Sequence, residues 1–104
     1  MGNDRFDVSD RVIVITGAGQ GLGREYALAF AKEGATPVLA EINGENMRKV
    51  AAEIEADGGT SLAVETDVSD PGSVNAMVAA AIDAYGRVDV LINNAAIFSR
   101  ITMA

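Results

Sequence analysis

The sequence predicts an α/β fold, in which helices cover the faces of a parallel sheet. Three observations predict it. Short apolar runs alternate with stretches of helical periodicity, and the connections between them are short. Only 5% of the 104 residues are aromatic, so small and branched aliphatic side chains must fill the core. Because strands that alternate with helices are joined by crossovers, we expect the strands to be parallel.

The first predicted strand covers residues 11–16, an apolar run that ends at a cluster of glycines. Such a run is typical of a strand that is buried on both faces. A helix is expected next, because Leu22, Tyr26 and Phe30 recur every four residues and predict its buried stripe. Gly34 is expected to end this helix.

The second predicted strand covers residues 37–41, and its proline is acceptable because it stands at the start. Asn43 is a candidate N-cap for the next helix. One face of that helix is apolar and is made of Met47, Val50, Ala51 and Ile54. Residues 58–59, both glycine, are expected to end it.

A third strand is predicted over residues 61–68, where apolar and acidic residues alternate. Asp70 and Pro71 then match an N-cap followed by proline at the first helical position. Gly86 is expected to close this helix, and residues 88–93 predict a fourth buried strand. The buried stripe of the helix is predicted to contain Val74, Met77, Val78, Ala81, Ile82 and Tyr85.

Composition and charge exclude several classes of function. The formal net charge is −7, which disfavours binding to nucleic acid or to an anionic membrane. The chain has no cysteine and no histidine, so we expect no disulfide and no metal site. No apolar run approaches the roughly 20 residues that span a bilayer, and residues 1–10 lack the apolar core of a signal peptide. We therefore expect a cytoplasmic protein that has no membrane partner.

The glycine cluster between the first strand and the first helix predicts a phosphate-binding loop. The spacing G-x-G-x-x-G fails in every register, whereas G-x-x-x-G-x-G fits Gly17, Gly21 and Gly23. These glycines would allow a tight turn, a close approach of the pyrophosphate and close packing of the helix. The pyrophosphate would then lie at the helix N-terminus. The alternative is that the glycines only form a tight turn.

Together with three further features, this loop resembles the cofactor loop of the short-chain dehydrogenase/reductase family. Glu41 ends the second strand, where members that prefer NAD carry an acidic residue. Asp67 and Val68 end the third strand. Residues 93–96 read Asn-Asn-Ala-Ala, where the family usually has Asn-Asn-Ala-Gly. The resemblance covers residues 6–96. It implies a Rossmann-type, doubly wound parallel sheet with strand order 3-2-1-4, of which this chain carries four strands and three helices.

The resemblance also implies which residues bind the cofactor. Glu41 would accept hydrogen bonds from the ribose hydroxyls and repel the 2′-phosphate of NADP, so NAD is expected and NADP less so. Each acidic or amide residue has a simpler interpretation: Glu41 as a solvated carboxylate, Asp67 as a polar strand end, Asn94 as a turn former. The predicted cofactor-binding residues are Gly17, Gln20, Gly21, Leu22, Gly23, Glu41, Asp67, Val68, Asn94 and Ala95.

The catalytic residues of the family are not expected in this chain. The resemblance implies a tyrosine with a lysine four residues later, but Tyr26 and Tyr85 are followed at that spacing by Phe30 and Asp89. We therefore expect residues 1–104 to be a partial NAD(P)-binding domain that lacks the catalytic half and is inactive alone. The parent protein would be an oxidoreductase that moves hydride between the nicotinamide and a secondary alcohol or ketone, as a homotetramer. The alternative is a non-catalytic nucleotide-binding or interaction fragment.

Overall fold

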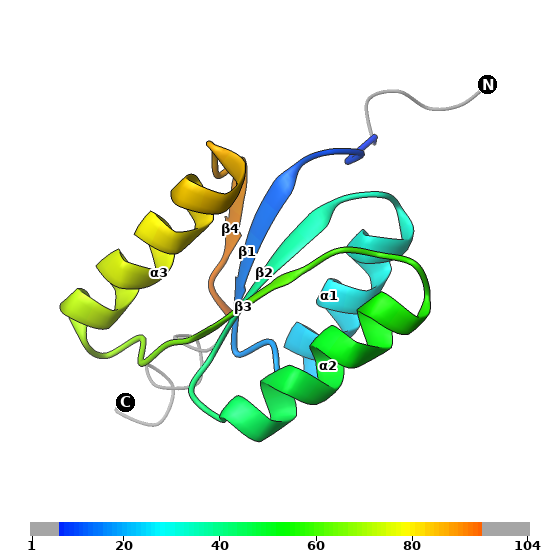
Figure 1. Cartoon of the computed structure of the whole chain (residues 1–104). Helices are drawn as coiled ribbons and strands as arrows, with labels where there is room; N and C mark the ends of the chain where they lie inside the picture. Colours follow the sequence, from blue (N-terminus) through cyan, green and yellow to red (C-terminus); the bar gives the residue numbers. More distant parts are fainter. Residues whose placement is uncertain (1–6, 95–104) are drawn as a thin grey trace.

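The computed structural model describes residues 7–94 and contains one parallel sheet (Figure 1). The strand order is β3-β2-β1-β4, and every neighbouring pair is parallel. The predicted doubly wound Rossmann-type architecture is therefore confirmed. The elements are β1 (Val12–Thr16), α1 (Gly21–Lys32), β2 (Thr36–Glu41), α2 (Gly44–Ala56), β3 (Leu62–Glu65), α3 (Pro71–Tyr85) and β4 (Val90–Ile92).

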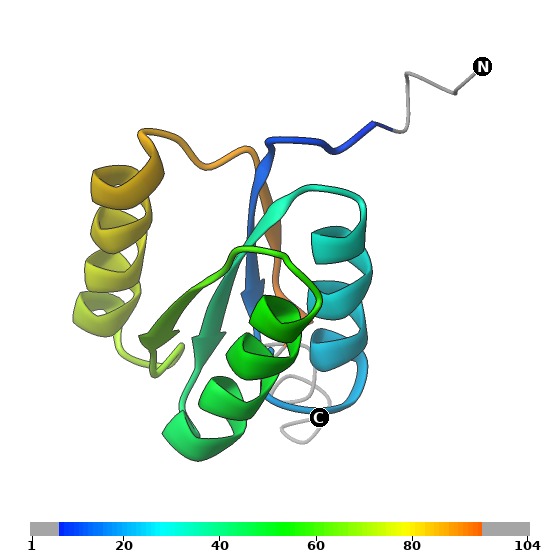
Figure 2. The ribbon, with the colours of Figure 1, turned by 45° about the vertical axis from the view of Figure 1, so that its right-hand side comes forward.

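The helices form a layer on each face of the sheet. Figure 2 shows α1 and α2 on one side and α3 on the other. Alternate residues of β1 point to opposite faces, so Ile13 and Ile15 pack with α1 and α2, while Val12 and Val14 pack with α3. All five residues of β1 are buried, as predicted for a central strand.

The predicted helix ends are confirmed. The Asn43 side chain accepts a hydrogen bond from the Asn46 N–H at 3.0 Å, and the Asp70 side chain accepts one from the Gly72 N–H at 3.0 Å. Gly86 follows α3 in the left-handed conformation, with φ of 78°. These caps satisfy backbone groups at the helix ends, so short local patterns were sufficient to locate them.

The predicted buried stripe of α1 is wrong. Leu22 and Tyr26 are 58% and 37% exposed, and only Phe30 of the three packs partly against the core. The buried residues of α1 are instead Gly23 and Ala27. At Gly23 the helix approaches the glycine loop so closely that no side chain fits there, and Leu22 and Tyr26 are turned outward.

The predicted burial of the fourth strand is also wrong. Val90 and Leu91 of β4 are 43% and 60% exposed, because β4 lies at the edge and pairs only with β1 in the described part of the chain. The predicted buried stripe of α3 is confirmed at Met77 and Ala81 but is wrong at Val78 and Ile82, which are exposed because no further element covers them in the described part of the chain. β3 and β4 are shorter than residues 61–68 and 88–93, over which they were predicted.

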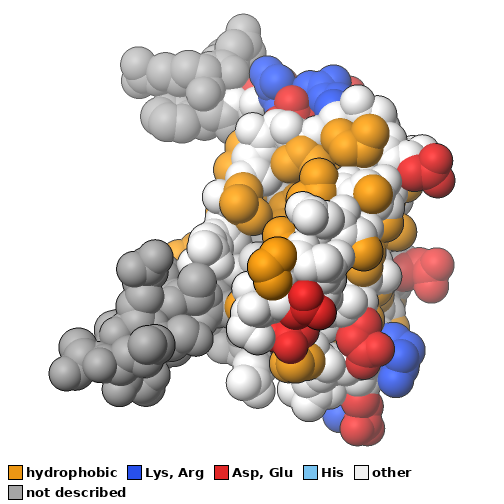
Figure 3. Space-filling model, turned by 90° about the vertical axis from the view of Figure 1, so that its left-hand side faces the viewer, with side chains coloured by type: hydrophobic (Ala, Val, Ile, Leu, Met, Phe, Trp, Pro, Cys, Tyr) orange, Lys and Arg blue, Asp and Glu red, His pale blue; other side chains and the backbone are white. Residues whose placement is uncertain are grey.

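Val78 of α3 and Leu91 of β4 form part of one apolar face, on the α3 side of the sheet. Figure 3 shows hydrophobic side chains gathered on this side of the molecule. Between α3, β1 and β4 there is an apolar groove of about 260 Å³, and its walls include Val14, Met77 and Leu91.

In residues 7–94, none of the helices combines the length and apolar content that a bilayer crossing requires.

Candidate functional site

The carboxyl ends of the four parallel strands meet at one edge of the sheet. The glycine loop follows β1, Glu41 ends β2, Asp67 follows β3, and Asn94 follows β4. Gly17, Glu41, Asp67 and Val68 line a common pocket of about 280 Å³ at this edge. In open parallel sheets, ligands bind outside the carboxyl ends of the strands, so this pocket is the candidate site.

Four predicted residues lie at the start of α1, outside the wall of that pocket. Gln20, Gly21 and Leu22 are exposed, and Gly23 is buried. Ala95 lies outside the described residues.

Sequence reasoning missed Gly19, Ile42, Thr66 and Ser69. The last three line the pocket, and Gly19 bonds to Glu41, as described below. The sequence signal for Gly19 was its presence as an additional glycine in the loop.

The glycine loop is shaped by two residues in the left-handed conformation. Gly17 and Gly21 have φ of 66° and 58°. The Gly17 N–H donates to the Ala40 carbonyl at 2.8 Å, so the loop is anchored to the end of β2. A Cβ at Gly23 would lie 2.0 Å from the Gly17 carbonyl oxygen, whereas a Cβ at Gly21 would have no atom within 4 Å. Gly23 is therefore required by close packing, and Gly21 faces open space.

The N-terminus of α1 is open to an anion. The N-cap Gln20 makes no capping hydrogen bond through its side chain, and the first turn contains no acidic residue. The first N–H groups of a helix have no intrahelical acceptor, and the positive end of the helix dipole is located there. This end of α1 can thus receive a phosphate group without competition from a carboxylate of its own first turn.

Glu41 is held by two backbone groups. Its Oε1 accepts a hydrogen bond from the Gly19 N–H at 2.9 Å, and its Oε2 accepts one from the Asn43 N–H at 2.9 Å. The residue is 8% exposed. Each carboxylate oxygen can accept more than one hydrogen bond, so both oxygens keep acceptor capacity for a ligand in the pocket. The carboxylate is thereby fixed in position while remaining able to bind hydroxyl groups.

Asp67 also lines this pocket, and its surroundings favour the charged form. Its Oδ1 accepts hydrogen bonds from the Ser69 hydroxyl at 2.6 Å and from the Ser69 N–H at 3.0 Å. These two hydrogen bonds lower the pKa of Asp67 below the usual aspartate value, and the bond from the Ser69 hydroxyl has the larger effect. The Asp67 N–H donates to the Ser73 Oγ at 2.9 Å, which ties this segment to α3. A charged carboxylate held in this orientation can accept a hydrogen bond from an amino group of a ligand.

The segment after β4 is tied to β1 and to the glycine loop. The Thr16 hydroxyl lies 3.2 Å from Asn93 Oδ1 and 3.4 Å from the Ile92 carbonyl oxygen. The Asn94 Nδ2 donates to the Gly17 carbonyl at 3.5 Å. Asn94 therefore contacts the glycine loop directly.

Among residues 7–94, no group of three or more acidic side chains is placed to hold a metal ion.

Comparison with known proteins finds dehydrogenases by sequence and by structure. A family model described as short chain dehydrogenase matches residues 11–104. The short chain dehydrogenase/reductase astE of Aspergillus oryzae is 46% identical over 98 residues, or 92% of this chain and 38% of the relative. A hydroxysteroid dehydrogenase from Escherichia coli superposes with a TM-score of 0.83 at 36% identity, over 86% of this chain and 38% of that one.

A second solved structure is a short chain dehydrogenase/reductase from Burkholderia phymatum in complex with NAD. It superposes with a TM-score of 0.80 at 37% identity, over 83% of this chain and 31% of that one. The chain thus spans between 31% and 38% of the length of these relatives. The order of the sheet, the glycine loop after β1 and the match over residues 11–104 agree with one another, and the chain belongs to the short-chain dehydrogenase/reductase family of oxidoreductases.

Proposed function

We propose that this chain forms the NAD-binding part of a dehydrogenase, and that the adenosine half of NAD binds in the pocket between Glu41 and Asp67. One observation carries the proposal: two backbone N–H groups fix the Glu41 carboxylate in the pocket wall at the end of β2. The carboxylate would accept hydrogen bonds from both ribose hydroxyls. Asp67 would accept one from the adenine amino group, and Val68 would lie against the ring.

The charges around the pocket support NAD over NADP. Glu41 and Asp67 are both acidic, and the described residues that line the pocket include no lysine or arginine. A 2′-phosphate would have to approach the Glu41 carboxylate without a compensating cation, and such like-charge contacts cost several kcal/mol. The relative from Burkholderia phymatum, which is similar over 83% of this chain, was crystallised with NAD.

The remaining cofactor contacts would come from α1 and β4. The free N–H groups at the start of α1 would bind the pyrophosphate, at the side of the loop where Gly21 leaves open space. Asn94, which contacts the Gly17 carbonyl, would lie beside the nicotinamide ribose. Bound NAD supplies hydride transfer, and we propose a secondary alcohol or ketone as the substrate.

Proton transfer is a separate requirement of this reaction. Reduction of a ketone needs an acid beside the carbonyl oxygen. The chain contains no tyrosine with a lysine four residues later and no histidine. We therefore propose that the catalytic acid is contributed by sequence other than these 104 residues, which by themselves bind cofactor without turnover.

The cofactor proposal is tested in the full-length protein by comparing kcat/KM for NAD and NADP. Glu41→Ala should lower the preference for NAD by about 10- to 100-fold, because it removes hydrogen bonds to a charged group. Adding Ile42→Arg should reverse the preference, since it supplies a cation for the 2′-phosphate. Glu55→Ala, which removes an exposed carboxylate from α2, is the control. A wild-type protein that prefers NADP would contradict the proposal.

A further inference from the structure

Gly19 lies in the glycine loop, where it is buried against the end of β2. Its N–H donates the 2.9 Å hydrogen bond to Glu41 Oε1, and this bond is buried. Gly19 occupies one of the unspecified positions of the G-x-x-x-G-x-G pattern, so that pattern does not explain a glycine here. The reason for this glycine must be sought in its surroundings.

The backbone conformation does not require glycine at position 19. Among the described glycines, those with positive φ are Gly17, Gly21, Gly34, Gly58 and Gly86, and Gly19 is not one of them. Other residue types could adopt its φ and ψ without the strain that positive φ imposes.

The space around position 19 does require glycine. A Cβ there would lie 2.8 Å from Glu41 Cγ, 2.9 Å from Glu41 Cδ and 2.9 Å from Asn46 Cβ. Carbon atoms in van der Waals contact are separated by about 3.5–4.0 Å. Two of these three atoms belong to the Glu41 side chain, so its observed position excludes a side chain at position 19.

The Glu41 side chain is the neighbour that can move. Asn46 Cβ is attached directly to the backbone of α2, whose first turn is capped by Asn43. The Glu41 carboxylate, in contrast, is at the end of a side chain that can change rotamer. A methyl group at position 19 would therefore displace the carboxylate and break its bond to the Gly19 N–H. A displaced carboxylate would no longer be fixed for hydrogen bonding to a ribose.

We propose that Gly19 is a specificity-determining residue, which sets the preference for NAD over NADP by leaving room for Glu41 and by holding its carboxylate. This inference rests on the proposed binding of NAD beside Glu41. It adds that the acidic residue is insufficient without glycine at position 19. Gly19 acts through Glu41 and is a positioning residue, not a catalytic one.

The test is a double-mutant cycle in the full-length protein, with dissociation constants for NADH and NADPH measured by calorimetry. The variants are Gly19→Ala, Glu41→Ala and the double variant. Gly72→Ala is the control, because a Cβ there would meet only Asp70 Oδ1, at an ordinary 3.4 Å. Circular dichroism and thermal denaturation establish that each variant is folded.

Gly19→Ala should lower the ratio of NADH to NADPH affinity by about tenfold when Glu41 is present, and by less than about twofold in the Glu41→Ala background. If Gly19→Ala unfolds the protein, the cycle is repeated with Asn46→Gly in every variant, because Glu41→Ala removes two of the three close contacts and Asn46→Gly removes the third. The double variant should then fold and show the cofactor ratio of Glu41→Ala.

Two results would overturn the proposal, and they are distinguishable. A protein that prefers NADH through Glu41 but whose preference survives Gly19→Ala overturns the role of Gly19 and leaves the proposed function intact. A wild-type protein that binds NADPH at least as tightly as NADH overturns both. An equal effect of Gly19→Ala in the two backgrounds also contradicts the role of Gly19, since its effect would then be independent of Glu41.

Discussion

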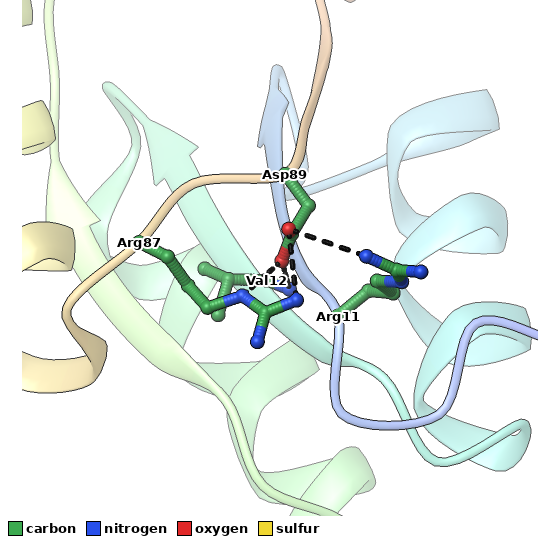
Figure 4. A network of polar contacts seen from close by, with 4 residues as sticks. All are labelled: Arg11, Val12, Arg87 and Asp89. Carbon is green, nitrogen blue, oxygen red and sulfur yellow. Dashed lines mark hydrogen bonds and ion pairs between the residues drawn. The ribbon is translucent and has the colours of Figure 1, made fainter.

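Asp89 and Val12 hold each other by two hydrogen bonds in opposite directions. The Val12 N–H donates to Asp89 Oδ2 at 2.8 Å, and the Asp89 N–H donates to the Val12 carbonyl at 2.9 Å (Figure 4). Arg87 donates to both carboxylate oxygens, at 2.8 and 3.0 Å, and Arg11 Nη1 lies 3.6 Å from Oδ1. This network joins the start of β1 to the start of β4 and thereby sets their register.

Replacement of Asp89 by asparagine should lower the free energy of unfolding at pH 7, because the charge that Arg87 binds is lost. The hydrogen bonds from Arg87 lower the pKa of Asp89 in the folded state most, and the hydrogen bond from the Val12 N–H lowers it further. Ionised Asp89 therefore contributes fully to the free energy of unfolding above the pKa that aspartate has in the unfolded chain. This contribution is lost as the pH falls through the lower pKa of Asp89 in the folded protein. Urea denaturation should show that the difference in the free energy of unfolding between wild type and Asp89→Asn becomes smaller from pH 7 to about pH 3.

The matched control for this experiment is Asp83→Asn, which neutralises an exposed aspartate on α3. It should change stability little at either pH. A difference between Asp89→Asn and wild type that is the same at both pH values would show that the charge of Asp89 does not contribute.

Gly21 and Gly23 should respond differently to substitution. Gly23→Ala should lower the free energy of unfolding by more than about 3 kcal/mol, beyond ordinary overpacking, because its Cβ would overlap the Gly17 carbonyl. Gly21→Ala should cost only about 1–2 kcal/mol, the strain of a left-handed residue, since its surroundings are open. Gly21→Val should leave the domain folded but abolish NADH binding, because a branched side chain would occupy the proposed pyrophosphate position.

Stability is measured by urea denaturation and binding by calorimetry, with Gly72→Ala as the control. Equal destabilisation by alanine at positions 21 and 23 would contradict the packing described for α1. Unchanged NADH affinity in Gly21→Val would mean that the loop serves only as a turn.

The apolar face formed by α3 and β4 should cause residues 1–104 to self-associate when they are expressed alone. Val78, Ile82, Val90 and Leu91 are between 40% and 60% exposed, and β4 presents an edge that another strand could extend. Sedimentation should show species larger than a monomer. Leu91→Lys, which places a charge on β4, should reduce the association, whereas Leu22→Lys on α1 should not. A monodisperse monomer would refute this prediction.

The sequence by itself determined the order and type of the elements and most of their ends. Asn43, Asp70 and Gly86 act through backbone groups a few residues away, so their roles can be deduced from local patterns. The same is true of β1, whose continuous apolar run is typical of a strand at the centre of a parallel sheet. The clustering of Glu41, Asp67 and Asn94 at one edge also followed from sequence, because parallel strands end on the same side.

Tertiary structure decided which face of a helix is buried and which glycine is indispensable. The spacing of Leu22 and Tyr26 matches a helical stripe, but the close approach of α1 buries Gly23 and Ala27 instead. The relation between Gly19 and Glu41 joins residues that are 22 positions apart. Periodicity describes neighbours along one helix or strand, whereas these contacts depend on the distance between elements, which is set only when the whole layer packs.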